Sequence, residues 1–148
     1  MKNMFFNYDN PTQQPEKEVG SCNKPLILST SDNITSLIKN IKEEVIGIQV
    51  KYASTFNFEV QLNECDLLYT QGSILKVELY TLSNKSVFKK EFETTTIFNA
   101  DTNKLNLTFS QEESKALNKE SYKMSLKLCK ENDFIEIFAP TDGFLIIR

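Results

Sequence analysis

Apolar and polar residues alternate along most of the chain, a spacing typical of β-strands that have one buried face. The clearest alternating runs are 56–62, 75–79, 105–109 and 122–128. Further apolar or β-branched segments lie at 45–50, 87–92, 94–98, 134–138 and 144–147. Roughly eight or nine short strands, with turn signals about every 8–12 residues, indicate a β-sandwich or barrel. We therefore predict a mainly β domain over 45–148, an antiparallel sandwich of the Ig-like or jelly-roll kind.

Helical spacing precedes these strands. Four aliphatic residues recur at positions i, i+3, i+4 and i+7: Ile34, Leu37, Ile38 and Ile41. The pair Ser31-Asp32 before them has good N-cap chemistry. The spacing predicts one short amphipathic helix that ends near Glu44. Its apolar stripe either covers one end of the protein's own core or binds a partner.

The first 24 residues differ from the rest, because they contain Pro11, Pro15 and Gly20 and show little periodicity. Such a segment cannot bury enough apolar area to offset its ordering entropy alone. Yet four apolar side chains gather near its start: Met4, Phe5, Phe6 and Tyr8. The segment is either a disordered tail or an extended arm that docks on a neighbouring subunit, and we favour the arm. The chain then divides into an arm and helix over 1–44 and a sandwich over 45–148.

Two features of the C-terminal half add to this picture. Ser110 and Glu113 have capping-box spacing, so we predict a short helical turn over 111–117, with Leu117 closing one end of the sandwich. The last two strands are apolar on both faces, and a second apolar face needs a cover, from the helix or from another subunit. Apolar anchors carry much of an interface's energy. The predicted partner-binding residues are Phe5, Phe6, Tyr8, Ile34, Leu37, Ile38 and Ile41.

The composition removes several kinds of chemistry. There is no His, the usual general base and the commonest transition-metal ligand. The four Gly form no phosphate-binding loop, and the three Cys show no CxxC spacing. The nearest carboxylate pair, Glu64 and Asp66, could serve a hydrolase but is better explained as a solvated acidic loop. We therefore predict a protein that is not an enzyme and uses no cofactor or metal.

The length and net charge of the chain limit the classes of partner that it can be expected to bind. The 148 residues suit one domain with its own core, and the net charge of −3 argues against non-specific nucleic-acid binding. No apolar run approaches the ~20 residues that a membrane-spanning helix needs. The N-terminus has no apolar core of signal-peptide length. We expect a protein that is made and used in a cytoplasm, or packaged there, without nucleic-acid or membrane partners.

The stretch from Leu105 to Leu128 resembles a known family. An alternating strand is followed by Ser-x-Glu-Glu-x-x-x-Leu, a short turn, and a Tyr that opens another alternating strand. The matching residues are Leu105, Leu107, Ser110, Glu112, Glu113, Leu117, Tyr122, Met124, Leu126 and Leu128. Weaker matches are 56–62, Asp66-Leu67, 75–79 and 142–147. The pattern is similar to small phage-particle proteins of the baseplate upper-protein N-terminal type. One position differs, because the family usually has Gly before the Tyr and this chain has Ser121.

The resemblance implies a sandwich that is built into a bacteriophage virion. Such modules decorate capsids, or join tail and fibre components, through sheet faces and extended arms and without cofactors. The partners would be other virion proteins, capsid or tail subunits, in a symmetric assembly formed in the host bacterial cytoplasm. The residues leave another function open, a free-standing recognition module for carbohydrate or protein. Its stacking aromatics would be Tyr52, Tyr69 and Tyr80.

Overall fold

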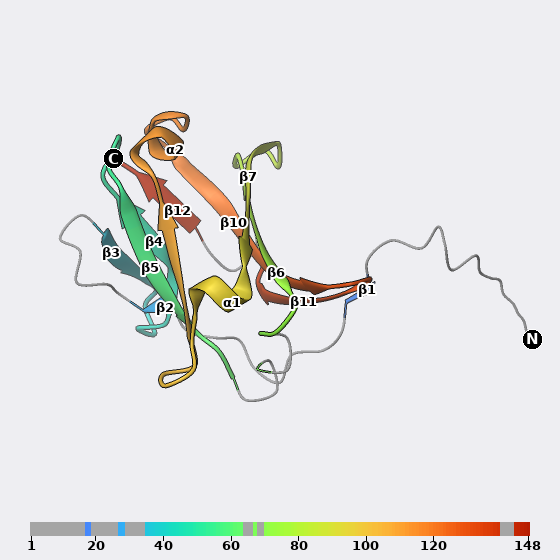
Figure 1. The fold of residues 1–148 in the computed structure, drawn as a ribbon. Coiled ribbons are helices and arrows are strands. Elements are labelled where there is room, and N and C mark those ends of the chain that lie inside the picture. Colours follow the sequence, from blue (N-terminus) through green and yellow to red (C-terminus); the bar gives the residue numbers. More distant parts are fainter. Residues whose placement is uncertain (1–16, 19–26, 29–34, 64–66, 68–69, 140–143) are drawn as a thin grey trace, which may run out of the picture.

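The computed structural model describes residues 17–18, 27–28, 35–63, 67, 70–139 and 144–148 (Figure 1). The strands within them are β1 Lys17–Glu18, β2 Ile27–Leu28, β3 Thr35–Lys39, β4 Val45–Val50, β5 Phe56–Gln61, β6 Ile74–Tyr80, β7 Ser86–Glu93, β8 Phe98–Asn99, β9 Lys104–Phe109, β10 Ser121–Lys130, β11 Asp133–Phe138 and β12 Phe144–Ile147. The helices are α1 Thr94–Ile97 and α2 Gln111–Lys115. The predicted mainly β fold is confirmed.

Among these residues, β10 is the centre of an eight-stranded sheet. One side of β10 pairs with β6, which pairs in turn with β7. On the other side, the start of β10 pairs with β12 and its end pairs with β11. The sheet continues from β12 through β4 to β3, and from β11 to β1. We predicted an antiparallel sandwich. The β12–β4 and β1–β11 pairs are parallel, so the larger sheet is mixed.

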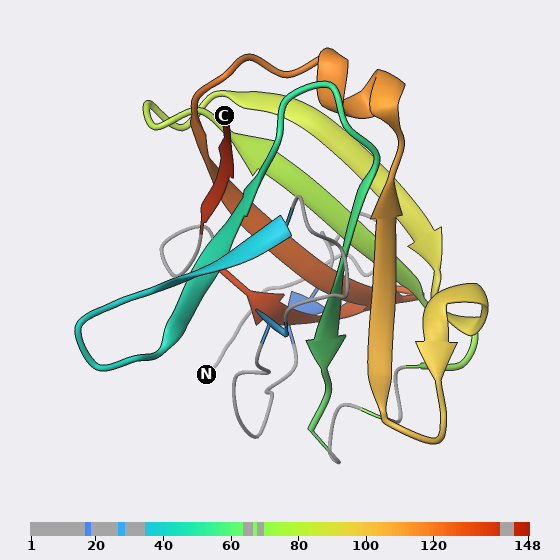
Figure 2. The same cartoon turned by 90° about the vertical axis from the view of Figure 1, so that its left-hand side faces the viewer.

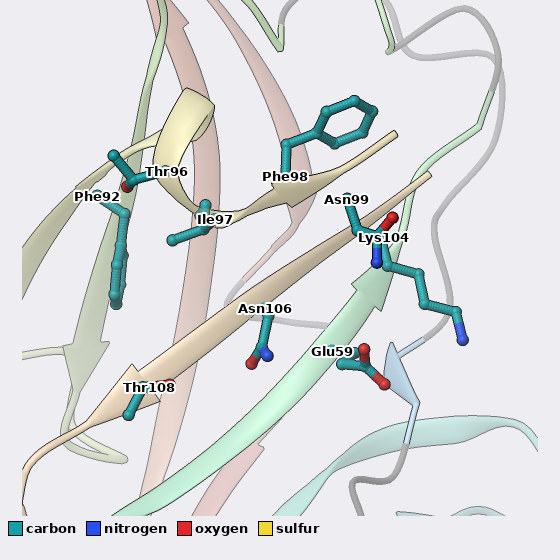
Figure 3. A pocket seen from close by; sticks show the side chains of 9 residues that line it. All are labelled: Glu59, Phe92, Thr96, Ile97, Phe98, Asn99, Lys104, Asn106 and Thr108. Carbon is teal, nitrogen blue, oxygen red and sulfur yellow. The ribbon is translucent and has the colours of Figure 1, made fainter. Parts of the chain in front are cut away.

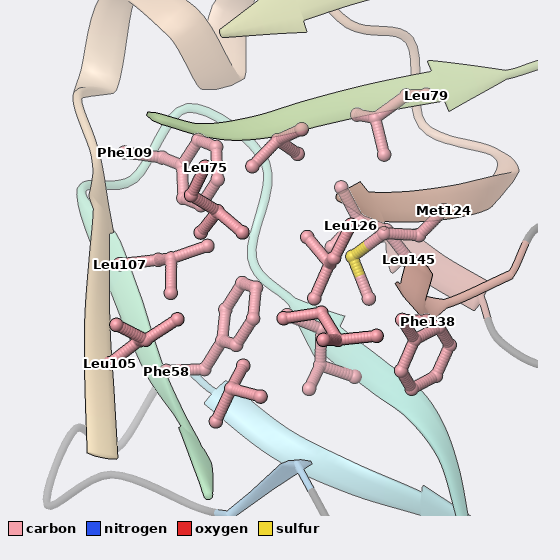
Figure 4. Close-up of a cluster of buried hydrophobic side chains, with 14 of the residues drawn as sticks. Phe58, Leu75, Leu79, Leu105, Leu107, Phe109, Met124, Leu126, Phe138 and Leu145 are labelled. Carbon is pink, nitrogen blue, oxygen red and sulfur yellow. The ribbon is translucent and has the colours of Figure 1, made fainter. Parts of the chain in front are cut away.

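A four-stranded sheet, in the order β2-β5-β9-β8, packs against the larger one (Figure 2). The core lies between them and follows from the alternation, since β5 and β9 bury every second residue, and β6 buries Leu75, Val77 and Leu79. Figure 4 shows how Phe58, Leu107 and Phe109 of the smaller sheet meet Leu126 and other residues of the larger one. The ring of Phe109 stacks on those of Phe56 and Phe58, with centroids 4.9 and 5.9 Å apart.

The prediction of a helix over residues 34–44 is wrong. Thr35–Lys39 is strand β3, which pairs with β4, and residues 40–44 turn the chain between them. The side-chain oxygen of Asn40 accepts from the backbone nitrogens of Lys42 and Glu44 at 2.9 and 3.0 Å, so it stabilises the turn. Short aliphatic spacings fit a helix or a strand, and pairing with β4 decides between them here. Because β2 pairs with β5 and β3 with β4, the sheets begin before residue 45.

The short helices show one further difference. Helix α2 and its capping box are as predicted, and Leu117 is buried. Residues 94–98, however, form mostly helix α1 and not the strand that their β-branched composition indicates. The hydroxyl of Thr94 is buried and donates to the backbone oxygens of Thr70 and Ser73 at 2.9 and 3.0 Å. This anchor fixes the point where the chain leaves β7 for the smaller sheet.

Candidate interaction surfaces

The structure separates the residues that we predicted to bind a partner. Phe5, Phe6, Tyr8 and Ile34 lie outside the described residues. Leu37 is half-buried and packs against the core, and Ile38 is half-buried in the same strand. Ile41 is fully exposed in the turn between β3 and β4. The three described aliphatic residues therefore form no common stripe, and Ile41 is the one of them that is open to a partner.

Strand β7 is an edge of the larger sheet. Among the described residues it pairs with β6 on one side and with no strand on the other. Lys89 and Glu91 face outward and are exposed, whereas three half-buried side chains face the core: Phe88, Lys90 and Phe92. A bulge ends the regular pairing near Val87, and α1 begins at Thr94. A free edge of this length presents unpaired backbone donors and acceptors to another strand.

A charged side chain faces inward from this edge. Lys90 lies opposite Val77 of β6, on the core face. Its ammonium group donates to a carboxylate oxygen of Glu113 at 2.7 Å and to the backbone oxygen of Thr108 at 2.9 Å. The ammonium also lies 4.8 and 5.0 Å from the ring centroids of Phe92 and Phe109. Lys90 therefore connects the edge of the larger sheet to β9 and α2.

This role of Lys90 was not predicted from the sequence. A signal was present, because Lys90 stands two residues from both Phe88 and Phe92, which alternate on the core face. That spacing places an ammonium group on an apolar face. Its partners, however, are distant in the chain, and no local pattern points to them.

Glu113 has two roles at the start of α2. Its carboxylate accepts from the backbone nitrogen of Ser110 at 2.8 Å, and the Ser110 hydroxyl accepts from the Glu113 nitrogen at 3.1 Å. Partial burial alone would raise the pKa of Glu113. The hydrogen bonds and charge of Lys90, with the hydrogen bonds of Ser110, outweigh burial and hold the pKa below its ordinary value. The carboxylate is therefore ionised at neutral pH and balances the charge of Lys90.

The outer face of the larger sheet pairs opposite charges across neighbouring strands. Lys89 of β7 lies opposite Glu78 of β6, with 3.9 Å between ammonium and carboxylate. Glu91 of β7 lies opposite Lys76 of β6. Lys89 and Glu91 therefore each have an opposite charge beside them on β6. On the other side of β7 lies the free edge of the sheet.

The outward face of strand β11 exposes less apolar surface to a partner than its sequence indicates. Ile135, Ile137 and Phe138 of β11 are buried in the sandwich. Phe134 faces the other way and is half-buried, with the ammonium of Lys127 lying 4.8 Å from its ring centroid. A long lysine side chain can cover apolar surface while its charge stays in water. The outward aromatic face of β11 is thus partly covered within the chain.

A cleft of about 400 Å³ lies on the outer face of the smaller sheet beside α1 (Figure 3). Its lining residues are Glu59, Phe92, Thr96, Ile97, Phe98, Asn99, Lys104, Asn106 and Thr108. Glu59 of β5 and Asn106 of β9 lie directly opposite each other. With the described part of the chain, the side chains of Glu59, Lys104 and Asn106 make no hydrogen bond or ion pair. A carboxylate, an ammonium and an amide are therefore open to a ligand, in a cleft within the ~300–1,000 Å³ range of small-molecule sites.

The remaining candidates that can be placed fall outside this cleft. Glu64, Asp66 and Tyr69 lie outside the described residues. Tyr52 is half-buried with the Lys119 ammonium 5.4 Å from its ring centroid. Tyr80 faces outward from β6, where partial burial, then the hydrogen bond and charge of Glu78, raise its pKa to about 12. The candidate aromatics that can be placed therefore do not line the cleft.

The described residues hold no group of three or more His, Cys, Asp or Glu side chains placed to bind a metal ion. Neither helix in these ranges has the length and apolar character to cross a membrane.

Comparison of the sequence with known proteins found no matching family model and no matching curated protein. A functional proposal therefore depends on the surfaces described above and on the resemblance of residues 105–128.

Proposed function

We propose that this chain is a structural component of a bacteriophage particle, either a capsid-decorating protein or an adaptor of the tail or fibre. In this proposal it is not an enzyme and acts through its N-terminal arm and its sandwich surfaces, bound to other virion proteins. It would reach the virion by assembly in the cytoplasm of the host bacterium.

The observation that carries the proposal is the free edge of β7, a strand of eight residues with a partner on one side only among the described residues. Proteins that assemble through sheets use such edges, because backbone hydrogen bonds provide affinity without a dedicated pocket. Fully exposed Ile41 at the β3–β4 turn gives a second candidate contact.

The residues that carry the family resemblance also form one continuous structural unit. Strand β9 leads into the capping box of Ser110 and Glu113, then α2, and the buried Leu117. Tyr122 then opens β10 with its ring in the core, and its hydroxyl accepts from the backbone nitrogen of Asn118 at 2.7 Å. This unit supports the resemblance, since these matched positions have defined structural roles.

Peptide mass spectrometry on gradient-purified virus particles tests the proposal. A copy number near that of the major shell protein would assign the chain to capsid decoration, and a much smaller number would assign it to the tail or fibres. Absence from particles, when the protein is present in the infected cells, would refute the proposal.

The contribution of the arm can be measured in the same experiment. Replacing Phe5, Phe6 and Tyr8 by Ser removes the proposed anchor side chains and changes no residue of the described sheets. We expect this triple variant to fold and to be lost from particles. Normal incorporation would assign the contact to other surfaces, of which the β7 edge and Ile41 are the candidates.

The cleft on the smaller sheet favours a second function, a free-standing recognition module. Its open carboxylate, amide and ammonium groups beside Phe98 suit a ligand rich in hydroxyl groups, such as a carbohydrate. A glycan array probed with the purified protein tests this function. Binding that is lost in Asn106→Ala and kept in Asn57→Ala, a change on the same outer face outside the cleft lining, would support recognition.

A further inference from the structure

The free edge of β7 is complementary to itself. Its regular part contains Phe88-Lys89-Lys90-Glu91-Phe92, between the bulge near Val87 and the start of α1. When two copies of this segment run antiparallel about Lys90, Lys89 of each lies opposite Glu91 of the other. Residues directly opposite in an antiparallel ladder have side chains on the same face and interact closely. The outer face would therefore gain two Lys–Glu pairs.

The core-side face of such a pair is also compatible. Phe88 of each copy would lie opposite Phe92 of the other, and both side chains are half-buried in the single chain. Aromatic pairs across strands are favourable. Their remaining exposed surface would be buried between the two copies.

The central residue, Lys90, would lie opposite itself, a pairing that is normally repulsive. Here each ammonium is bound to Glu113 at 2.7 Å and to the backbone oxygen of Thr108 at 2.9 Å in its own chain. Both contacts draw the charge toward the smaller sheet of the same copy. The charge is therefore balanced before a second copy arrives.

The same charges disfavour neighbouring registers. A pairing centred on Lys89 would place two Lys89 side chains opposite each other on the outer face, with no Lys–Glu pair within β7. One centred on Glu91 would place two carboxylates opposite each other at its centre, and this repulsion opposes the Lys89–Glu93 pairs that it would form at the strand ends. Like charges directly opposite destabilise a strand pair. The register about Lys90 also continues the alternation within each copy, because Lys89 already lies beside Glu78, and Glu91 beside Lys76.

We propose that two copies of this chain associate through antiparallel pairing of their β7 strands, centred on Lys90, so that their larger sheets become one continuous sheet. In a virion, the paired dimer would be a two-fold unit of the symmetric assembly, and only this role rests on the proposed function. The association itself is a property of the isolated protein.

Two charge reversals test this pairing. Lys89→Glu places a second carboxylate opposite Glu91, and Glu91→Lys places a second ammonium group opposite Lys89, so each variant has only like pairs with itself. In a dimer of one variant with the other, residues 89 and 91 are acidic in one copy and basic in the other, so every cross-strand pair joins opposite charges. Sedimentation velocity on the full chain should show a dimer for the wild type, with a dissociation constant raised roughly tenfold or more for each variant alone. The mixture should recover the dimer.

The mixture also controls for folding, since two misfolded variants would not restore each other. Lys85→Glu makes the same charge change at an exposed turn residue off the edge and should leave the dimer intact. The proposal is overturned if the wild type stays monomeric at every concentration, if the single variants dimerise like the wild type, or if the mixture does not associate. Each of these results leaves the particle measurement standing, which separates this inference from the proposed function.

Discussion

Lys90 and Glu113 form an ion pair between the larger sheet and the helix that follows β9, with 2.7 Å between ammonium nitrogen and carboxylate oxygen. Their side chains are only 24% and 29% exposed, so water screens the pair less than it would on an open surface. A lysine that points inward from an edge strand also discourages pairing with unrelated strands. The pair thus affects both the stability of the sandwich and the choice of partner at its edge.

Replacing Lys90 by Met should destabilise the fold by about 1–2 kcal/mol. The change keeps a flexible apolar side chain over Phe92 and Phe109 but removes the ion pair and the hydrogen bond to Thr108. Lys104→Met is the matched control, because this half-buried lysine has no ion pair in the described chain, and it should change stability by less than about 0.5 kcal/mol. Urea unfolding of dilute protein measures both, and equal effects would contradict the role of Lys90.

The same pair should make stability depend on acid pH. The folded pKa of Glu113 lies below its unfolded value of about 4.5, so the folded state binds this proton less readily. Its contribution is therefore present above pH 4.5 and is lost as the pH falls through the folded pKa. Glu113→Gln keeps an oxygen acceptor for the capping box and removes the charge.

Unfolding curves of both proteins between neutral and acid pH would measure this dependence. We expect the wild type to be the more stable at neutral pH and the difference to shrink at acid pH. A difference that stays constant over the whole range would show that the charge of Glu113 does not stabilise the fold.

The parts of the fold that could be predicted are those that local sequence specifies. Alternation identified β5, β9 and β10 because a strand with one buried face repeats every two residues whatever its partner. The capping box was visible because Ser110 and Glu113 are three residues apart. The β3–β4 hairpin was missed because the spacing of Leu37, Ile38 and Ile41 also fits a helix, and only contacts with β4 distinguish them.

The candidate surfaces could not be predicted from the sequence, for a related reason. The free edge of β7 follows from the order of the strands in the described sheet, in which β7 pairs with β6 alone. The cleft requires Glu59 and Asn106 to be opposite each other, which is a property of the β5–β9 register. Neither relationship is contained in a window of neighbouring residues.

Two substitutions separate the hairpin from the helix that the sequence indicated. Leu37 packs against the core, whereas Ile41 is fully exposed, so Leu37→Ala should cost about 1–2 kcal/mol and Ile41→Ser less than about 0.5 kcal/mol. On one buried helical stripe the two changes would have similar costs. Thermal unfolding distinguishes the outcomes, and a large effect of Ile41→Ser would contradict the hairpin.

Gly47 provides the sharpest test of the parallel pairing between β4 and β12. It lies opposite Phe144 of β12, and a side-chain carbon at this position would overlap the backbone oxygen of Phe144 and lie 2.8 Å from its nitrogen. Backbone atoms in a paired strand cannot move aside without breaking the ladder. Gly47→Ala should therefore destabilise the protein by about 1–3 kcal/mol, the usual cost of overpacking.

The control for this change is Gln49→Ala in the same strand, which removes one exposed hydrogen bond with Arg148 and should cost less than about 1 kcal/mol. Hydrogen exchange would locate the damage, because the amides of β12 should lose protection in Gly47→Ala before those of β5 and β9. If Gly47→Ala were as stable as the wild type, with β12 still protected, β12 could not lie against β4 in this register.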